Sequence, residues 1–384
     1  MELKVPEGVV ARMYTIGMEE EFFVFDAQTR RAVQRVDKGF FKAARERLGD
    51  RVMTEMLQSQ IEVATPPCAT VAEARTHLAG YRRVLGEVAR GHGLGLAAMG
   101  TFPLAFWPEQ QMTPKSRYGE IMDDLQMIGH RNMLCGMHVH VEVPDLDTRI
   151  NLIMRLTPYL PLLLALSTSS PFWQGELTGL VGYRLAAYDE LPRTGLPELF
   201  RTNADYDEFV DALVGANIIP DASYIWWAIR PSLSNPTIEL RVADSCTRLD
   251  DAVAIGALFR CLVRSLDRNR DRNAGFDRVG RAITQENKWH AQRYGTAATF
   301  IDPFSREPVE ARDWLDEVLD IVAEDVAVFG CEGHIKRLKT IVTNGTSANE
   351  QVGIFAKSRA ADRERLTAIH DVIDWAAAET LAVG

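Results

Sequence analysis

Apolar residues recur every three or four positions in four stretches of the chain, which is the spacing of a helix with one buried face. The clearest stretch opens with Thr70-Val71-Ala72-Glu73, a capping box in which the threonine and the glutamate satisfy free backbone N–H groups, and it ends near Gly91. The other three stretches are residues 250–269, 312–329 and 358–378. The pattern therefore predicts four long helices that pack on a hydrophobic core.

Strand-like stretches lie elsewhere, and each of them mixes apolar with ionisable residues. They are residues 14–25, 52–65, 94–99, 134–143, 224–230 and 237–243. These stretches come in clusters, with long helices between and after them, which favours an α+β fold with a largely antiparallel sheet over a doubly wound parallel sheet. Because no repeat, low-complexity stretch or linker interrupts the chain, we expect one domain that spans residues 1–384.

Ionisable residues in four of these strands share one face of the predicted sheet. Side chains alternate along a strand, so Glu19 and Glu21 lie on one face, while Glu20 lies on the other face among apolar neighbours. The same alternation places on a common polar face the groups Gln58, Gln60 and Glu62; His138, His140 and Glu142; and Glu239 and Arg241. We call this the ionic face of the sheet.

A polar face in water is the simplest explanation for any one of these strands. A solvated face is usually rich in lysine, threonine and serine, however, whereas these strands have carboxylates, amides, histidines and an arginine. Carboxylates held close together repel each other, and removing each from water costs several kcal/mol unless a positive charge compensates. Mg²⁺ prefers carboxylate oxygens and substrate phosphates, so the four strands together predict a metal site on the ionic face.

The His138-x-His140 pair leaves several roles open. Two histidines on one strand can bind zinc, and with a carboxylate they would form a hydrolase site. The chain has eight histidines but no HExxH motif and no third histidine at a matching spacing. Zinc binding, a substrate or hydrogen-bonding role and a structural role all remain possible at this point.

Composition narrows the classes of partner. The net charge is −10, without a basic patch, which argues against a nucleic-acid partner. The five cysteines are far apart and never form a CxxC pair, which argues against a disulfide framework and fits a reducing compartment. No signal peptide is recognisable, and the uncharged residues 156–173 are interrupted by Pro158 and Pro161, which indicates a buried core helix instead of a membrane span. We therefore expect a cytoplasmic protein without a membrane partner.

Eight motifs, in order along residues 15–302, resemble the bacterial carboxylate–amine ligase family, relatives of glutamate–cysteine ligase type 2. They are TIGMEEEF, LQSQIEVAT, TPKSRYGEI, CGMHVHVEVPD, SSPFWQGELTG, LPRTGLPELF, YIWWAIRPSLSNPTIELRVADSCT and ENKWHAQRYG. The resemblance implies a fold similar to glutamine synthetase and the guanidino kinases, in which a curved antiparallel sheet forms a funnel with helices packed on its outside. It also implies a homodimer that uses ATP and Mg²⁺, with Mn²⁺ able to substitute.

The resemblance assigns roles to residues of the ionic face. It implies Glu19, Glu21, Glu62 and Glu239 as metal ligands, and His138, Glu239 and Arg241 as catalytic residues. Candidates for binding ATP or substrate are Gln58, Gln60, His140, Arg230, Lys288 and Arg293. The implied reaction joins a small-molecule carboxylate, glutamate, to cysteine or another amine through an acyl phosphate. The segment 176–197, rich in proline and glycine, is a candidate loop that closes over this intermediate.

Two departures from the family pattern put the acceptor specificity in doubt. Phe102 stands where the family has the histidine of a GTHP motif, and Asn349 begins Asn-Glu-Gln where an Arg-Gln-Arg stretch is common. Alternatives to a ligase are a phosphotransferase of the guanidino-kinase type, a zinc hydrolase built on His138 and His140, and a degenerate family member that acts as a binding subunit.

Overall fold

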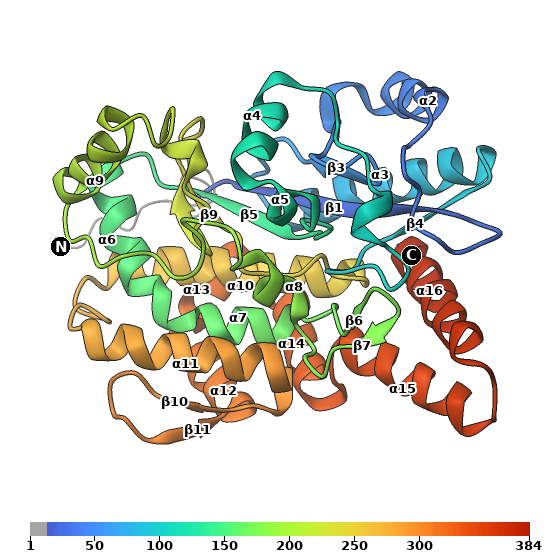
Figure 1. Ribbon diagram of the computed structural model, residues 1–384. Helices are drawn as coiled ribbons and strands as arrows, with labels where there is room; N and C mark the ends of the chain where they lie inside the picture. The colour runs from blue at the N-terminus through green and yellow to red at the C-terminus, as the bar shows by residue number, and fades with distance from the viewer. Residues whose placement is uncertain (1–13) are drawn as a thin grey trace.

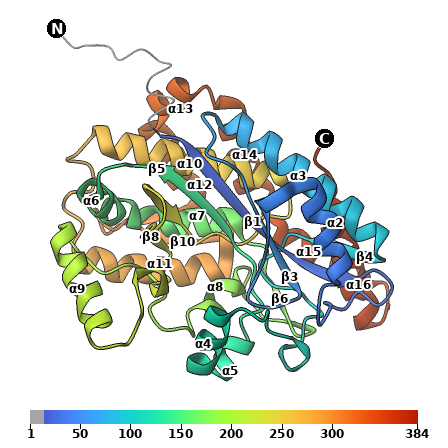
Figure 2. The same ribbon diagram turned by 90° about the horizontal axis from the view of Figure 1, so that it is seen from above.

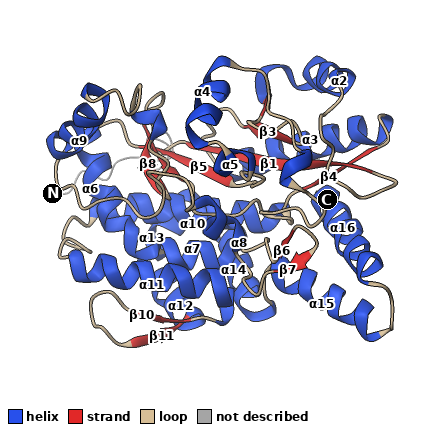
Figure 3. Cartoon of the chain, in the orientation of Figure 1, coloured by secondary structure: helices blue, strands red, loops and turns tan. Residues whose placement is uncertain are grey.

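An antiparallel sheet of seven strands forms the centre of the computed structural model, which describes residues 14–384 (Figures 1 and 3). The strand order is β2-β3-β1-β5-β9-β8, and β4 also pairs with β1. The bounds are β1 Ile16–Asp26, β2 Val52–Thr54, β3 Gln60–Ala64, β4 Leu94–Ala97, β5 Met137–Glu142, β8 Ile229–Pro231 and β9 Thr237–Leu240. Two small hairpins join β6 Phe172–Trp173 to β7 Glu176–Leu177, and β10 Thr299–Ile301 to β11 Pro308–Glu310. The predicted α+β fold with an antiparallel sheet is confirmed.

Long helices cover the apolar face of this sheet. α10, Leu249–Arg268, and α3, Val71–Gly91, pack against β1, and α10 also packs against β5 (Figure 2). The helices further from the sheet or around its edges are α2 Lys38–Leu48, α4 Ser116–Leu125, α5 Met127–His130, α6 Leu146–Leu156, α7 Leu160–Ser167, α8 Tyr183–Tyr188, α9 Asn203–Gly215, α11 Arg278–Tyr294, α12 Ala311–Ile321, α13 Ala323–Phe329, α14 Glu332–Asn344, α15 Ser347–Ala360 and α16 Arg365–Leu381. The largest hydrophobic cluster lies between these helices and the sheet, while the opposite face has a smaller cluster around Phe23, Phe25 and Phe102 and leaves the rest of that face for a cavity.

Several predicted boundaries were wrong. Residues 52–65 are two strands, because the chain turns at residues 58–59, where the backbone N–H of Gln60 bonds to the carbonyl of Leu57 at 3.1 Å. The stretch 224–230 is mostly irregular and becomes a strand only at β8. The predicted helix 358–378 is two helices, α15 and α16, and α14 was not predicted.

The predicted core helix at the start of residues 156–173 corresponds to α7. Residues Leu146–Ser167 contain an 18-residue window with a mean hydropathy of 1.4, long and apolar enough to cross a membrane, but 89% of this window is buried inside the protein. All eight residues of α7 are buried. The segment has the environment of a core helix of a folded domain.

Glu20 points to the apolar face, as its position in the alternation predicts. There it forms a two-pronged ion pair with Arg82 of α3, with distances of 2.6 Å from Nη2 and 2.9 Å from Nε, and both side chains are fully buried. The Arg82 guanidinium also donates to the carbonyls of Cys246 and Thr247. This pair fixes the strand with the metal-site candidates to the helix behind it.

Replacing Glu20 by Gln leaves the buried charge of Arg82 without its counter-ion. We expect the free energy of unfolding to fall by about 3–5 kcal/mol in a guanidinium denaturation curve. Glu87, on the same helix, pairs with Arg47 at the surface, so the control Glu87→Gln is expected to cost less than about 1 kcal/mol. Equal losses in the two variants would contradict a structural role for the Glu20–Arg82 pair.

Candidate active site

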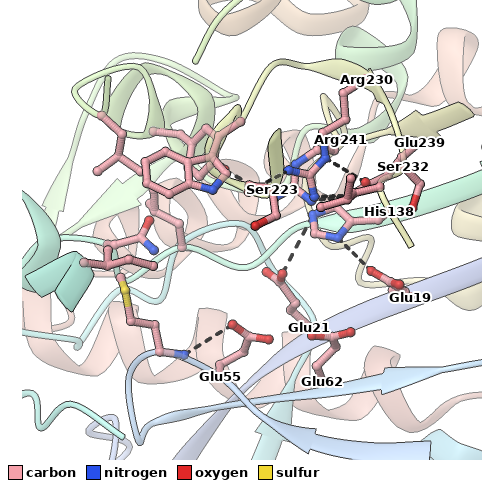
Figure 4. Close-up of a pocket in the computed structure, with 18 of the residues that line it drawn as sticks. Glu19, Glu21, Glu55, Glu62, His138, Ser223, Arg230, Ser232, Glu239 and Arg241 are labelled. Atoms are coloured by element: carbon pink, nitrogen blue, oxygen red, sulfur yellow. Dashed lines mark hydrogen bonds and ion pairs between the residues drawn. The ribbon is translucent and has the colours of Figure 1, made fainter. Parts of the chain in front are cut away.

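A cavity of about 520 Å³ lies on the ionic face of the sheet (Figure 4). The sheet forms its floor, and its walls come from α4, from the segment around α8 and from residues 222–235. The predicted site residues that line it are Glu19, Glu21, Gln60, Glu62, His138, His140, Arg230, Glu239 and Arg241. Eight of these residues belong to the ionic face, and Arg230 of β8 is the ninth predicted residue in the cavity.

Pairing between strands sets which of these residues face each other. Glu21 of β1 is directly opposite Glu62 of β3, and Glu19 is directly opposite His138 of β5. Glu239 of β9 lies between His140 of β5 and Arg230 of β8. Residues directly opposite each other on antiparallel strands have side chains close together. The ionisable side chains on the cavity floor therefore form two groups, one around Glu21 and Glu62 and one around Glu19 and Glu239.

The first group consists of Glu21, Glu55 and Glu62. One carboxylate oxygen of each lies within 4.8 Å of the others, an arrangement that could hold a metal ion. The backbone N–H of Gly136 donates to Glu21 at 2.5 Å. Burial, followed by repulsion from Glu55, raises the pKa of Glu21 to about 8, and burial and the same neighbour raise the pKa of Glu62 well above its usual range. Fully ionised, the group would hold more negative charge than the protein itself neutralises.

Glu55 was missed by the sequence analysis. Under a continuous strand over residues 52–65, residue 55 falls on the face opposite Glu62, but the turn at residues 58–59 resets the alternation. The side chain of Glu55 therefore reaches the same cavity as Glu62. The only signal in the sequence was an acid seven residues before Glu62, and that spacing has no meaning without the turn.

The second group consists of Glu19, His140 and Glu239, which also have ligand atoms within 4.8 Å of one another. His138 Nδ1 lies 3.0 Å from Glu19, and His140 Nε2 lies 3.3 Å from Glu19. Burial raises the pKa of Glu19, but the hydrogen bonds from the two imidazoles outweigh it and hold this pKa well below its usual range. Glu19 is therefore ionised in the folded protein.

The pKa values of the two histidines are shifted in opposite directions. Burial and the nearby charge of Arg241 lower the pKa of His138 to about 4, so His138 is neutral at pH 7 and donates its Nδ1 proton to Glu19. Burial also lowers the pKa of His140, but the carboxylate of Glu19 outweighs it and raises this pKa above its usual range. The Nε2 atom of His138 is buried without a hydrogen-bond partner and lies 3.8 Å from Glu21, whereas the Nε2 atom of His140 faces Glu19.

Two arginines neutralise Glu239. Arg230 donates from Nε at 2.7 Å and from Nη2 at 3.2 Å, and Arg241 donates to the same carboxylate. Burial raises the pKa of Glu239, but Arg241 and Arg230 outweigh it, so Glu239 stays ionised. The Nε atoms of Arg241 and of Arg184, a further cavity residue, are buried and have no hydrogen-bond partner. These unsatisfied donors suit an anion in the cavity.

The donor set of the first group fits Mg²⁺ better than zinc. Its three ligands are all carboxylates, which Mg²⁺ prefers, and its raised pKa values reflect the missing positive charge. In residues 14–384, neither group with metal-binding geometry contains both histidines of the HxH motif. The geometry thus gives no support to a zinc pair made by His138 and His140.

Three predicted residues lie outside the cavity. Gln58 is in the turn before β3, and its amide donates to the carbonyl of Met112 at 2.8 Å. Lys288 is buried beside Asp189, with which it forms an ion pair. Arg293 is exposed on α11 and lies 5.0 Å from the ring of Tyr294. The structure gives these residues local partners, which their chemistry alone could not reveal.

The segment 176–197 reaches the cavity but also contributes fixed contacts. Arg184, Tyr188 and Leu191 line the cavity, and Tyr188 accepts a hydrogen bond from Arg241 at 3.3 Å. Further lining residues without a prior prediction are Lys115, Arg117, Tyr118 and Trp226. They lie outside the four strands of the ionic face, so the alternation argument could not find them.

The two departures from the family pattern lie away from the cavity lining. Phe102 is buried and packs against Phe23 and Phe25, with ring centroids 5.5 and 5.4 Å away. Asn349 caps α15 by accepting from the backbone N–H of Thr346 at 2.9 Å. Both residues have a structural partner, and neither removes a residue from the ionic face.

The raised pKa of Glu21 predicts how stability depends on pH without metal. The folded protein keeps a proton on Glu21 between the ordinary value of 4.5 and about 8, whereas the unfolded chain loses it. The stabilisation is complete below the lower value and is lost as the pH rises through the upper one. In EDTA, we expect the free energy of unfolding to fall over this range, and the fall to be smaller in Glu21→Gln. The control Glu142→Gln, on β5, should keep the wild-type slope, and an unchanged slope in Glu21→Gln would contradict the account.

Comparison with known proteins agrees with this geometry. A model of glutamate-cysteine ligase family 2 matches residues 15–369. A protein of Bradyrhizobium sp. (strain ORS 278), provisionally named glutamate–cysteine ligase 2, is 46% identical over 369 residues, which cover 96% of this chain and 88% of the relative. A protein of Rhodospirillum rubrum with the same provisional name is 44% identical over 373 residues, which cover 96% of each chain.

Solved structures share the fold at low sequence identity. A bifunctional glutathione synthetase from Pasteurella multocida has a TM-score of 0.69 at 15% identity, over 97% of this chain and 53% of that one. A glutamate–cysteine ligase from Francisella tularensis, in complex with AMP, has a TM-score of 0.65 at 11% identity, over 96% and 89% of the two chains. The predicted fold is thereby confirmed, and from the family match over nearly its whole length we conclude that the chain belongs to glutamate-cysteine ligase family 2.

Proposed function

We propose that the protein is an ATP-dependent, ADP-forming carboxylate–amine ligase. The observation that carries the proposal is the content of one cavity, where two groups of acids with metal-binding geometry lie beside buried arginine donors that have no partner. Phosphoryl transfer requires positioning and neutralisation of charge on the moving group, which metal ions and arginines supply. The AMP bound to the Francisella tularensis ligase supports ATP as the nucleotide.

The proposed reaction has two steps. The substrate carboxylate attacks the γ-phosphorus of ATP, which forms an acyl phosphate and releases ADP. The amine then attacks the acyl carbon, which forms the amide bond and releases phosphate. The names of the relatives support glutamate as the acid, with its γ-carboxylate as the reacting group, and cysteine or another amine as the acceptor.

The arginines would bind and orient the phosphates and the substrate carboxylate. Arg241 is held by Glu239 and Tyr188, which fix the plane of its guanidinium and leave Nε free for an anion. Arg230 is anchored on Glu239 and on the carbonyls of Ser223 and Ile225. Because both guanidiniums are held before substrate arrives, little reorganisation is required when charge develops on the phosphoryl group.

Bound Mg²⁺ would supply the charge neutralisation that ATP requires. Glu21, Glu55 and Glu62 would hold one ion, and Glu19, His140 and Glu239 are candidates for a second. The second group competes with the arginines for Glu239, so a shift of at least one guanidinium would accompany its use as a ligand.

His138 is suited to orient the attacking amine by accepting a hydrogen bond from it, because its low pKa keeps the ring neutral. Its Nδ1 proton is fixed toward Glu19, which leaves the unpaired Nε2 as an acceptor inside the cavity. Tyr188 and Leu191 of the segment 176–197 form part of the wall, and closure of this segment would keep water from the acyl phosphate.

We further propose a cytoplasmic homodimer with one catalytic domain over residues 1–384.

A coupled assay of ADP release tests the reaction class. Amines, including cysteine, are screened in the presence of glutamate, ATP and Mg²⁺. We expect ADP to form only when the amine is one that the enzyme accepts. The activity should disappear in EDTA and return with Mg²⁺ or Mn²⁺. A phosphorylated product without amide formation would indicate a kinase, and no turnover with any amine would indicate a binding subunit. Full activity in EDTA, or restoration by Zn²⁺ alone, would contradict the use of Mg²⁺.

Replacing Arg241 tests its role in phosphoryl transfer. Loss of one such contact costs about 10²–10³ in rate, so we expect Arg241→Gln to slow single-turnover ADP formation by that factor at saturating acid and ATP. Arg241→Lys keeps the charge but loses the planar geometry, so it should recover only part of the rate. A normal single-turnover rate with a raised KM would make Arg241 a binding residue only.

A further inference from the structure

The loop that joins β8 to β9 lines two cavities. Its residues 231–235 face the candidate active site and also a second cavity of about 490 Å³. The second cavity is bounded by α6, α9 and residues 220–222. Helices α6 and α9 lie next to each other at the left of Figure 1. A volume of this size suits a small organic ligand, and none of the proposed chemistry uses it.

The wall opposite the loop is mostly apolar. Val210 and Val214 are four residues apart on α9, so they share one face of that helix, and Tyr206 lies one turn before Val210. Leu146 at the start of α6 and Pro220 complete this wall. The wall would accommodate an alkyl or aromatic group.

A buried positive charge in the cavity forms no direct ion pair. Arg149 of α6 lines the cavity and is only 9% exposed. Its Nη1 donates to the carbonyls of Ser232 at 3.4 Å and Asn235 at 3.2 Å, but its Nε is buried with no hydrogen-bond partner. Asp145, one helical turn before Arg149, acts on its charge, but Arg149 forms no ion pair within residues 14–384. A buried guanidinium in this state is costly, and a carboxylate is the partner that would compensate it.

Two acids line the same cavity at a distance from Arg149. Asp207 lies one helical turn before Val210 on α9 and accepts from the side-chain amide of Asn203 at 2.6 Å. Asp221 accepts from the backbone N–H of Ser223 at 2.7 Å. A simple carboxylate would bind Arg149 but meet the field of these acids, whereas a zwitterion would use both signs of charge.

We propose that the second cavity binds an α-amino acid with an apolar side chain. Its carboxylate contacts Arg149, its ammonium lies toward Asp207 and Asp221, and its side chain packs on Val210 and Val214. Occupancy is communicated to the candidate active site through the loop 231–236, because Arg149 binds two carbonyls of this loop. At the other side, Thr237, which follows the loop, bonds to His140 Nδ1 at 2.9 Å.

The probe for binding is L-leucine, titrated calorimetrically into the full-length protein in EDTA without ATP. The comparison ligands are 4-methylpentanoic acid, which lacks the ammonium, and 3-methylbutylamine, which lacks the carboxylate. We expect L-leucine to bind and each analogue to bind at least about 10-fold more weakly, since each loses one charged contact. Amide hydrogen exchange of residues 232–235 should change when L-leucine binds.

Variants assign the binding to this cavity. Val210→Trp fills the apolar wall and should abolish L-leucine binding, and Asp207→Asn should weaken it about 10-fold. Asp211 is an exposed acid on the same helix that does not line the cavity. In the control Asp211→Asn, the affinity for L-leucine should stay within about 2-fold of the wild-type value, because surface substitutions have small effects. Unchanged affinity in Val210→Trp would place the ligand elsewhere and overturn the proposal.

Three further outcomes would also count against it. No binding of L-leucine at millimolar concentration would leave Arg149 as a brace for the loop. Equal affinity for 4-methylpentanoic acid would remove the role of the acids. Unaltered amide hydrogen exchange at residues 232–235 with L-leucine bound would overturn the link to the candidate active site. None of these measurements depends on ligase activity, so the outcome is separate from that of the proposed function.

Discussion

Repulsion among buried carboxylates is the constraint on which the rest of this structure depends. The antiparallel sheet brings acids from β1, β3 and β9 to one face, and the segment after β2 adds another. Desolvated like charges at this spacing are unfavourable unless a cation, a proton or a guanidinium compensates them. The structure shows two of these responses, a guanidinium at Glu239 and a raised pKa at Glu21 and Glu62, and the proposed metal ion would be the third.

The protein's own cations neutralise some of these acids completely. Glu20 on the apolar face is matched by Arg82, and Glu239 on the ionic face is matched by Arg230 and Arg241. Glu21, Glu55 and Glu62 have no comparable partner, and the raised pKa values of Glu21 and Glu62 follow from that imbalance. The imbalance, more than the number of acids, distinguishes a place for a metal ion from a structural ion pair.

The sequence was a good guide wherever a regular strand carried the residues. Alternation along β1, β5 and β9 placed Glu19, Glu21 and Glu239 on one face and Glu20 on the other, because a strand has a fixed period. It failed for Glu55 and Gln58, because the turn at residues 58–59 breaks the alternation.

Long-range packing was the other limit of the sequence. Lys288 looked suited to phosphate, but tertiary packing puts it next to Asp189, a neighbour that no local pattern encodes. Arg184 and Trp226 reach the cavity from outside the four strands for the same reason.

The most direct test of metal binding by the three unpaired carboxylates is anomalous diffraction from crystals grown with Mn²⁺. The account predicts a manganese peak at about 2 Å from carboxylate oxygens of Glu21, Glu55 and Glu62. Manganese bound only elsewhere, with these three carboxylates uncoordinated, would contradict it.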